Sequence, residues 1–485
     1  MLRRATLLVL TLATLTTALA GCLGNGNVLL QALPTTDLPK LPALGFAKEV
    51  AIDKGHRGGE PSIVVDGKGS YFVSAPSGMV TTVFNSALDP RSAQGQGPQN
   101  RESFIWKSSD QGASWQLLSL TPPPLPPLRG DAAPGGADTD LAVDGCDTIY
   151  FTDLWAGNIA ISHSDDAGAT WTGVPVSGAR PALDRQWLAA GKECGTVYLL
   201  FQSIVDQLPQ LWVLKSTDKG MTFPQQTLVL DCNTDKDCYS FNGQLILDDA
   251  SGNLYFPAGL ADGKGLWVFK SADQGKTWSK TAVPMSDADQ PLALLPALAS
   301  DAAGNLYADL AIHRGGSFNV YLTRSSDQGA TWSPYMAMSG PEASGTELFP
   351  WVAAGDAGRV AVAWMGVADT VDKPDDVKGD WFIFMALSEN ADGAQSSWQV
   401  SKVSERSNHQ GGYCTLGLGC TLPQPVGTRG NRNLADFFEI AVDRDGRAIA
   451  TWPDDTDTAD QFVALPYFGR QVDGPLLHPP LAKGK

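Results

Sequence analysis

The stretch SADQGKTW, residues 271–278, decides the fold because it recurs along the chain with the same order of polar and aromatic residues. The other copies are SSDQGASW (108–115), SDDAGATW (164–171), STDKGMTF (216–223) and SSDQGATW (325–332). Their third residues are the aspartates Asp110, Asp166, Asp218, Asp273 and Asp327, which lie 56, 52, 55 and 54 residues apart. An even period of this length indicates a repeat architecture.

Each copy has the composition of a hairpin turn. An alternating strand such as residues 266–270 precedes the motif, and a short strand that begins at the aromatic residue follows it. In S-x-D-x-G the aspartate can accept backbone N–H groups across the bend, the glycine can adopt a positive φ, and the tryptophan can cover the corner. The five aspartates are therefore expected to be structural, with direct ligand binding as the alternative.

The repeated motif resembles the Asp-box, or BNR, repeat of the sialidase-like β-propellers. In that family the box closes the hairpin between the third and fourth strands of each blade, on the face away from the active site. The resemblance covers nearly all of the mature chain and implies a propeller fold. It does not by itself imply an activity, because the same box occurs in non-enzymatic propellers and in other glycosidases.

The remaining strands of each repeat predict the number of blades. Two strands joined by a hairpin precede each box, at residues 62–74, 140–153, 186–201, 243–258 and 296–311. Two further copies with an eroded box follow, at 351–399, which keeps an Asp-Gly at Asp392, and at 438–469. The last copy lacks a fourth strand, which residues 45–52 could supply by pairing the two ends of the chain. We predict an all-β propeller of seven four-stranded antiparallel blades, with the six blades of catalytic sialidases as the alternative.

The N-terminus has the features of an export signal. Residues 1–21 contain two arginines and an uncharged apolar run that is too short to cross a bilayer. The sequence LAGC that ends at Cys22 resembles the bacterial lipobox, in which the cysteine is diacylated; an ordinary signal peptide followed by a free thiol is the alternative. We predict a signal peptide (1–21), a Gly- and Pro-rich tether (22–45), the propeller (46–470) and a C-terminal tail (471–485). The protein is expected to be lipid-anchored to the bacterial cell envelope, at the outer or the plasma membrane.

The seven cysteines support export. If Cys22 carries lipid, six cysteines remain and can all pair in an oxidising compartment. A metal site is the alternative for the C-x5-C spacings, but no nearby histidine completes a zinc ligand set. We predict three disulfides, Cys146–Cys194 between neighbouring blades and Cys232–Cys238 and Cys414–Cys420 within small loops, and no metal or other cofactor.

The charge of the chain restricts its partners. The formal net charge is −17, and such an acidic chain repels nucleic acid and anionic lipid. Nucleic acid is therefore not expected as a partner, and membrane attachment is expected to depend on the acyl chains at Cys22. The chain is expected to be a monomer.

Strand direction predicts which loops meet over the central channel. If the third-to-fourth and first-to-second turns share one face, then the connections between blades and the second-to-third loops share the other. Arginines bind carboxylates, acids accept hydrogen bonds from hydroxyls, and indoles stack on sugar rings. The residues expected on this second face include Arg57, Glu60, Asp138, Asp184, Arg185, Trp187, Arg314, Glu347, Trp351, Arg432 and Asp436. We expect them to bind a ligand; the alternative is that some of them merely tie adjacent blades together.

Two functions follow from this face. The preferred one is recognition of a glycan or another extracellular ligand by Arg57, Asp184, Arg185, Trp187, Arg314, Trp351, Arg432 and Asp436. The alternative is an exo-α-sialidase-type glycoside hydrolase, with Arg57, Glu60, Asp138, Arg314, Glu347 and Arg432 as catalytic candidates. The Arg-Ile-Pro signature of the family's first blade is absent, and no tyrosine matches the family nucleophile by motif, so catalytic roles do not transfer. A scaffolding role in an envelope complex is the third candidate.

Overall fold

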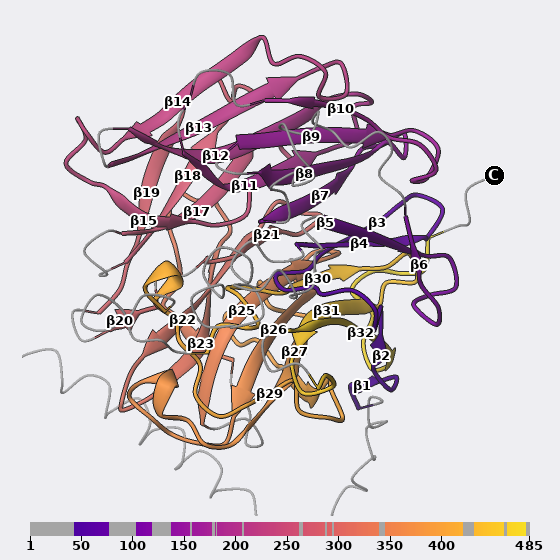
Figure 1. Ribbon diagram of the computed structural model, residues 1–485. Coiled ribbons are helices and arrows are strands. Elements are labelled where there is room, and N and C mark those ends of the chain that lie inside the picture. Colours follow the sequence, from indigo (N-terminus) through magenta and orange to yellow (C-terminus); the bar gives the residue numbers. More distant parts are fainter. Residues whose placement is uncertain are drawn as a thin grey trace, which may run out of the picture. The chain divides into compact units, whose positions relative to one another are not determined.

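The computed structural model describes residues 43–76, 103–118, 137–155, 158–176, 180, 182–205, 208–260, 265–286, 289–292, 295–338, 345–420, 431–459 and 463–481. In these residues the strands form seven antiparallel sheets, each of which is one blade of a β-propeller (Figure 1). The predicted seven-bladed propeller is therefore confirmed, and the six-bladed alternative is wrong. The predicted signal peptide and Cys22 lie outside the described residues.

The blades follow one another along the chain. The first blade contains β3 (Ser62–Val65), β4 (Tyr71–Pro76), β5 (Ser103–Ser108) and β6 (Gln116–Leu117). The second contains β7 (Thr139–Val143), β8 (Ile149–Trp155), β9 (Asn158–Ser164) and β10 (Thr172–Pro175). The third contains β11 (Leu183–Ala190), β12 (Val197–Val205), β13 (Leu208–Ser216) and β14 (Gln225–Asp231).

The later blades divide some of their strands into two pieces. The fourth contains β15 (Tyr239–Asn242), β16 (Ile246–Leu247), β17 (Leu254–Leu260), β18 (Leu266–Ser271) and β19 (Ser279–Val283). The fifth contains β20 (Gln290–Pro291), β21 (Leu298–Ser300), β22 (Leu306–His313), β23 (Phe318–Ser325) and β24 (Met336–Ala337). The sixth contains β25 (Thr346–Ala354), β26 (Val360–Val367), β27 (Asp380–Ser388), β28 (Gln399–Lys402) and β29 (His409–Gln410). Short 3-10 helices, η4 (Pro374–Asp376) and η5 (Gly417–Cys420), lie in the connections of the sixth and seventh blades.

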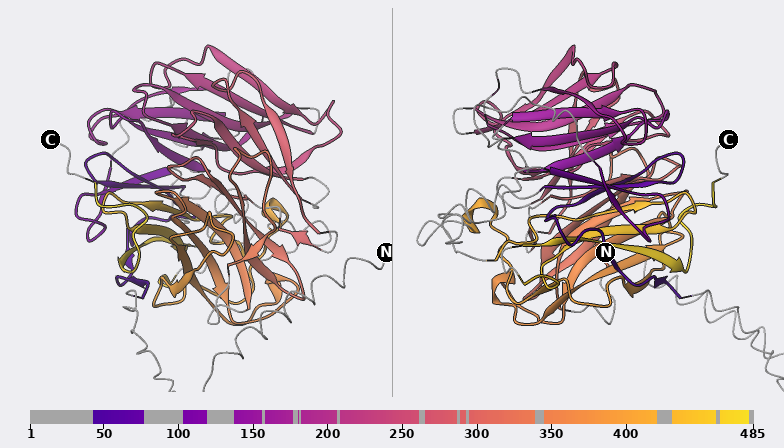
Figure 2. Two further views of the ribbon diagram at one scale, coloured as in Figure 1. Left: turned by 180° about the vertical axis from the view of Figure 1, so that it is seen from behind. Right: turned by 45° about the vertical axis from the view of Figure 1, so that its right-hand side comes forward.

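The seventh blade closes the ring by joining the two ends of the described chain. Its three C-terminal strands are β30 (Glu439–Val442), β31 (Ala448–Asp454) and β32 (Leu465–Asp473). The N-terminal strands β1 (Gly45–Phe46) and β2 (Val50–Ala51) both pair with β32, as the sequence predicts. Figure 2 shows these indigo and yellow strands side by side. This pairing gives the last blade its outermost strand and covers the edge of β32.

The burial of a strand's residues depends on the position of the strand within its blade. Every residue of β26 is buried, because a central strand has a neighbouring blade on each of its two faces. The outer strand β14 instead alternates partly buried and exposed residues along most of its length. Among the described residues, no helix has the length and apolarity that a bilayer span requires.

The Asp box is a hydrogen-bonded turn, as its fifth copy illustrates. Asp327 Oδ1 accepts from the Ser325 hydroxyl (2.7 Å) and from the backbone N–H of Thr331 (2.8 Å), and Oδ2 accepts from the Thr331 hydroxyl (2.6 Å). Gln328 and Gly329 both have left-handed backbone conformations, with φ of 60° and 83°. The other four boxes form the same three carboxylate bonds, around Asp110, Asp166, Asp218 and Asp273.

The sixth blade keeps this turn with asparagine in place of aspartate. Asn390 Oδ1 accepts from the Ser388 hydroxyl (3.2 Å) and from the backbone N–H (2.9 Å) and hydroxyl (3.2 Å) of Ser397. An amide oxygen can accept the same donors as a carboxylate. The residue that replaces the box aspartate is therefore Asn390, and not the Asp392 that the sequence pattern suggests.

Turns between first and second strands also connect neighbouring blades. Asp144 Oδ1 accepts from the N–H groups of Cys146 (2.9 Å) and Thr148 (3.0 Å), and its Oδ2 accepts from the N–H of Gly195 (2.7 Å) in the next blade. The Cys146–Cys194 disulfide joins the same two blades, with a Cα–Cα distance of 5.3 Å. The other two predicted disulfides, Cys232–Cys238 and Cys414–Cys420, are also present. In the described part of the chain, no group of three or more His, Cys, Asp or Glu residues is placed to hold a metal ion.

Buried carboxyl groups connect the inner strands of several blades. Glu439 Oε2, at the start of β30, accepts from the N–H of Ile63 in the first blade (3.0 Å), and Ser62 donates to Asp140 Oδ1 in the second (3.0 Å). Asp140 Oδ2 accepts from the N–H of Leu188 in the third blade (2.6 Å). Burial raises the pKa of Asp140 to about 7, and burial together with the charge of Asp140 raises the pKa of Glu439 well above its ordinary value of 4.5.

These raised pKa values predict that stability falls with increasing pH. The folded chain binds the Glu439 proton more tightly than the unfolded chain does. The contribution of Glu439 to the free energy of unfolding is therefore fully present below its ordinary pKa of 4.5 and is lost as the pH rises through its pKa in the folded chain. Glu439→Gln keeps the oxygen that accepts from Ile63 but cannot ionise. By urea denaturation at pH 5 and pH 8, we expect this variant to gain roughly 1–3 kcal/mol relative to the wild type on going to pH 8. Identical pH dependence in the two proteins would contradict this assignment; Glu389→Gln, at the surface beside Arg359, is the control.

The eroded turn of the sixth blade gives a second prediction. Asn390→Ala removes the oxygen that accepts all three turn hydrogen bonds, and should lower the free energy of unfolding by roughly 1–2 kcal/mol. Asp392→Ala should change it by less than about 0.5 kcal/mol, because Asn390 already makes the turn bonds. Thermal and urea unfolding of both variants measure the difference. A larger loss for Asp392→Ala would show that the aspartate, and not the asparagine, holds this turn.

Candidate ligand-binding site

The predicted ligand face lies at the opposite ends of the strands from the Asp boxes. On the box face, Lys219 contacts Asp165 of the preceding blade's box (2.6 Å), and Gln111 in the first box donates to Asp445 in a first-to-second turn (2.9 Å). Boxes and first-to-second turns therefore share one face. The inner strands β3, β7, β11 and β30 begin at the other face. Several of the predicted site residues lie just before these strands or in their first positions.

Aromatic side chains fill the axis of the propeller. Trp187 in β11, Trp351 in β25 and Phe437 before β30 contact one another, with ring centroids 5.1–5.8 Å apart. These residues come from the third, sixth and seventh blades, which can meet only at the centre of the ring. Their exposed fractions are 2%, 2% and 4%, so the two tryptophans predicted to stack on a ligand are covered by protein.

A cluster of charged side chains lies on the ligand face and also spans several blades. We call it the axial cluster, and its members are Glu60, Asp138, Arg185, Arg432 and Asp436. At its centre Asp436, which is buried, accepts from both arginines: Arg185 Nη2 donates to Oδ2, and Arg432 donates to Oδ1 and, at 2.6 Å, to Oδ2. Arg185 and Asp436 are 251 residues apart in sequence and belong to the third and seventh blades.

Arg185 also forms ion pairs with two further carboxyl groups, but no hydrogen bonds to them. Its Nη1 lies 3.8 Å from Glu60 Oε1 and 3.7 Å from Asp138 Oδ2, both beyond hydrogen-bond distance. This Nη1 is buried and has no hydrogen-bond partner among the residues that the structure describes, and the same holds for the Nε atoms of Arg185 and Arg432. Unpartnered donors are rare in protein interiors and call for an explanation, such as a bound molecule.

The members of the axial cluster differ in how tightly they hold protons. Burial, and next the charges of Asp138 and Asp436, raise the pKa of Glu60 well above its ordinary value. Burial alone would raise the pKa of Asp436 too, but Arg432 and Arg185 outweigh it and hold that pKa far below its usual range. The surroundings therefore favour the neutral form of Glu60 and the anionic form of Asp436.

The backbone is strained at two residues of the axial cluster and at one residue beside it. Glu60, Arg185 and Ala435 have φ of 44°, 52° and 65°, a region that residues with a side chain rarely adopt. Asn242 donates to the carbonyl of Arg185 (3.0 Å), and the N–H of Asp436 donates to Glu60 Oε1 (2.8 Å). Strain that the surrounding contacts maintain is characteristic of functional sites.

Each small disulfide loop adjoins a buried tyrosine that supports this region. Tyr413 precedes Cys414, and its hydroxyl donates to the carbonyl of Ala435. Tyr239 follows Cys238 and donates to Gln202 (3.1 Å), which in turn donates to Asp184 Oδ2 (3.1 Å). Burial, and next the charge of Asp138, raise the pKa of Asp184 to about 6, so Asp184 lies beside the axial cluster.

The other predicted site residues have separate partners. Arg314, whose side chain is 43% exposed, donates two bonds to Asp289 (2.8 and 2.7 Å). Glu347 accepts from the N–H of Val320 in the preceding blade (2.8 Å), and burial raises its pKa to about 8, so it connects the fifth and sixth blades. Arg57 is half-buried three residues before Glu60.

Three neighbours of the axial cluster were not among the predicted site residues. Gln186 donates to the carbonyl of Asp138, the ring of Phe241 lies 5.6 Å from the Arg185 guanidinium, and Phe437 packs in the axis. Gln186 and Phe437 are the residues next to Arg185 and Asp436. Their position next to a predicted site residue could have identified them from the sequence. A β-bulge in β11 and the bend before β30 bring successive side chains toward the axis.

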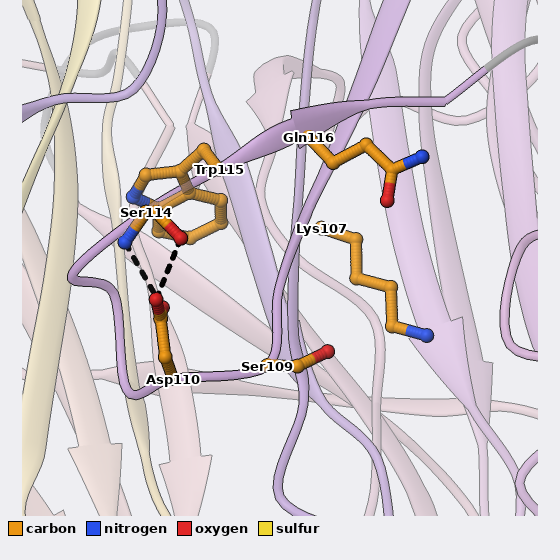
Figure 3. Close-up of a pocket in the computed structure, with 6 residues that line it drawn as sticks. All are labelled: Lys107, Ser109, Asp110, Ser114, Trp115 and Gln116. Atoms are coloured by element: carbon orange, nitrogen blue, oxygen red, sulfur yellow. Dashed lines mark hydrogen bonds between the residues drawn. The ribbon is translucent and has the colours of Figure 1, made fainter.

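A pocket of about 280 Å³ lies at the first Asp box, on the other face (Figure 3). Asp110 at its base is already bonded to the N–H (2.9 Å) and hydroxyl (2.6 Å) of Ser114, and Lys107 donates to the carbonyl of Ala167 (3.1 Å). The charged groups of this pocket therefore serve the turn and its contact with the next blade. Its lining residues are Lys107, Ser109, Asp110, Ser114, Trp115 and Gln116.

Comparison with known proteins gives distant structural likenesses. The sequence matches no family model and no curated protein. A protein of unknown function from Dyadobacter fermentans is similar in structure with a TM-score of 0.47 and 13% identity, over 89% of this chain and 100% of that chain. An α-L-arabinanase from Penicillium chrysogenum is similar with a TM-score of 0.44 and 11% identity, over 88% of this chain and 98% of that chain. The sialidase NanB from Streptococcus pneumoniae is similar with a TM-score of 0.45 and 10% identity, over 88% of this chain and 92% of that chain. No function follows from likenesses this distant.

Proposed function

We propose that this propeller binds a polyhydroxylated ligand, such as a glycan, at the axial cluster. The supporting observation is Arg185 Nη1, a buried donor that lies between the carboxyl groups of Glu60 and Asp138 and has no hydrogen-bond partner in the described part of the chain. Leaving such a donor unpaired costs free energy, so a ligand atom that accepts its hydrogen would be bound favourably.

A hydroxyl group suits this position because it accepts and donates at the same time. Its oxygen would accept from Arg185 Nη1, and its hydrogen would be donated to Asp138 or Glu60. Asp138 has the largest exposed fraction of any side chain in the axial cluster, 19%, so a ligand would approach past it. Sugars carry many such hydroxyl groups, which is why a glycan is the preferred ligand class.

Glycoside hydrolysis is the second candidate, and the raised pKa of Glu60 favours it. A carboxyl group that keeps its proton beside an ionised one can act as a general acid. However, Tyr413 donates to the carbonyl of Ala435, and Arg314 is paired with Asp289. Because these groups are engaged elsewhere, we prefer binding over exo-sialidase catalysis.

Asp138→Asn tests this site. The amide keeps the shape of the side chain but not its charge, so we expect binding on a glycan array to weaken about tenfold or more, with little change in Tm because Asp138 is partly exposed. Lys215→Met, on the box face, is the control and should bind as the wild type does. Equal binding by Asp138→Asn and the wild type would contradict the site. Turnover of a fluorogenic sialoside by the wild type would favour the hydrolase instead.

We also infer that Cys22 anchors the protein to a membrane through lipid. The three disulfides indicate an exported protein, and they use the other six cysteines, which leaves Cys22 available for acylation. In a bacterial host, Cys22→Ser should move the full-length chain from the membrane fraction to the soluble fraction and abolish labelling by a palmitate analogue. Retention of the variant in the membrane fraction would contradict lipid anchoring.

A further inference from the structure

Asp436 occupies the position that the carboxylate of a ligand would take between two arginines. Arg185 and Arg432 both donate to it, and Arg432 does so with two nitrogens, one to each carboxylate oxygen. Paired donation of this kind is how arginine binds carboxylates in general. The protein therefore contains its own carboxylate where an acidic ligand would need to bind.

Asp436 is also held in place through its backbone. Its N–H donates to Glu60 Oε1 (2.8 Å), and the carbonyl of the preceding residue, Ala435, accepts from the buried hydroxyl of Tyr413. Its side chain is fully buried, so it has no solvent to move into without breaking these contacts. A carboxylated ligand would have to displace it and would leave a buried carboxylate without its partners, which is strongly unfavourable.

The charge of the region also opposes an anionic ligand. The two guanidiniums of the axial cluster face the carboxyl groups of Glu60, Asp138 and Asp436, with Asp184 beside them. Four carboxyl groups therefore lie around two guanidiniums. Cationic side chains attract a carboxylate only where their charge is not already neutralised.

We propose that the ligand of the axial cluster is an uncharged polyhydroxylated molecule, and that Asp436 excludes carboxylated sugars by occupying both arginines. This inference rests on the proposed function and specifies its ligand class. Replacing Asp436 by a smaller neutral residue vacates its position between the two guanidiniums and converts the cluster into a binding site for carboxylates.

The first test compares the wild type with Asp436→Ala on one array that carries neutral plant and bacterial glycans and glycans with sialic, glucuronic or galacturonic acid. The wild type should bind neutral glycans only, and Asp436→Ala, which vacates the carboxylate position, should gain at least about tenfold in binding to carboxylated ones. Wild-type binding to carboxylated glycans as strong as to neutral ones would overturn the inference. A wild type that binds no glycan would contradict the proposed function, and the second test would then decide the inference.

The second test needs no glycan and measures Tm in sodium formate or acetate against sodium chloride of equal ionic strength. Asp436→Ala should be less stable than the wild type and should recover several degrees in formate, because formate replaces the missing carboxylate. The wild type should not respond, since Asp436 already occupies the arginines. Stabilisation of the wild type by formate, or a folded Asp436→Ala that does not respond, would overturn the inference. If Asp436→Ala does not fold, Asp436→Ser replaces it, because serine retains a hydroxyl acceptor and is short enough to leave room for formate.

Discussion

The carboxylate of the Asp box is the constraint on which the rest of the structure depends. It accepts the backbone N–H and the hydroxyl of the residue four positions later, and the hydroxyl of the serine two positions earlier, so every bond is made within one hairpin. Each blade can therefore form its turn without its neighbours. Because the five boxes share this geometry and one face, the inner strands all begin at the opposite face, where the polar connections between blades collect.

The centre of the ring is closed by side chains from opposite blades. Trp187, Trp351 and Phe437 fill the axis, and the ion pair of Arg185 with Asp436 lies at the ligand face. A buried ion pair contributes little net stability, but removal of one partner is costly because it leaves the other unpaired. The pair therefore specifies how the third and seventh blades meet, and it determines which charges remain available to a ligand.

Carboxyl groups near the axis connect neighbouring inner strands, but their burial makes the charged form unfavourable. Glu439 and Glu347 each accept a backbone N–H from an adjacent blade, and burial raises the pKa of both. Protonation is the less costly state for a carboxyl group that has lost its water and has no cation beside it. The axial cluster differs because its arginines stabilise the anion at Asp436 and hold the pKa of that carboxyl far below its usual range, whereas burial raises the pKa of the neighbouring Glu60.

The sequence by itself determined the repeats, the seven blades, the pairing of the two chain ends and the three disulfides, because local turns and short-range spacing encode these features. Only the tertiary structure decided which charged residues combine. Arg185 pairs with Asp436 and Arg314 with Asp289, although the sequence presents all four in similar polar loops. Contacts between distant blades, such as that of Arg185 with Asp436, form when the ring closes, and their distances are not encoded in any local pattern.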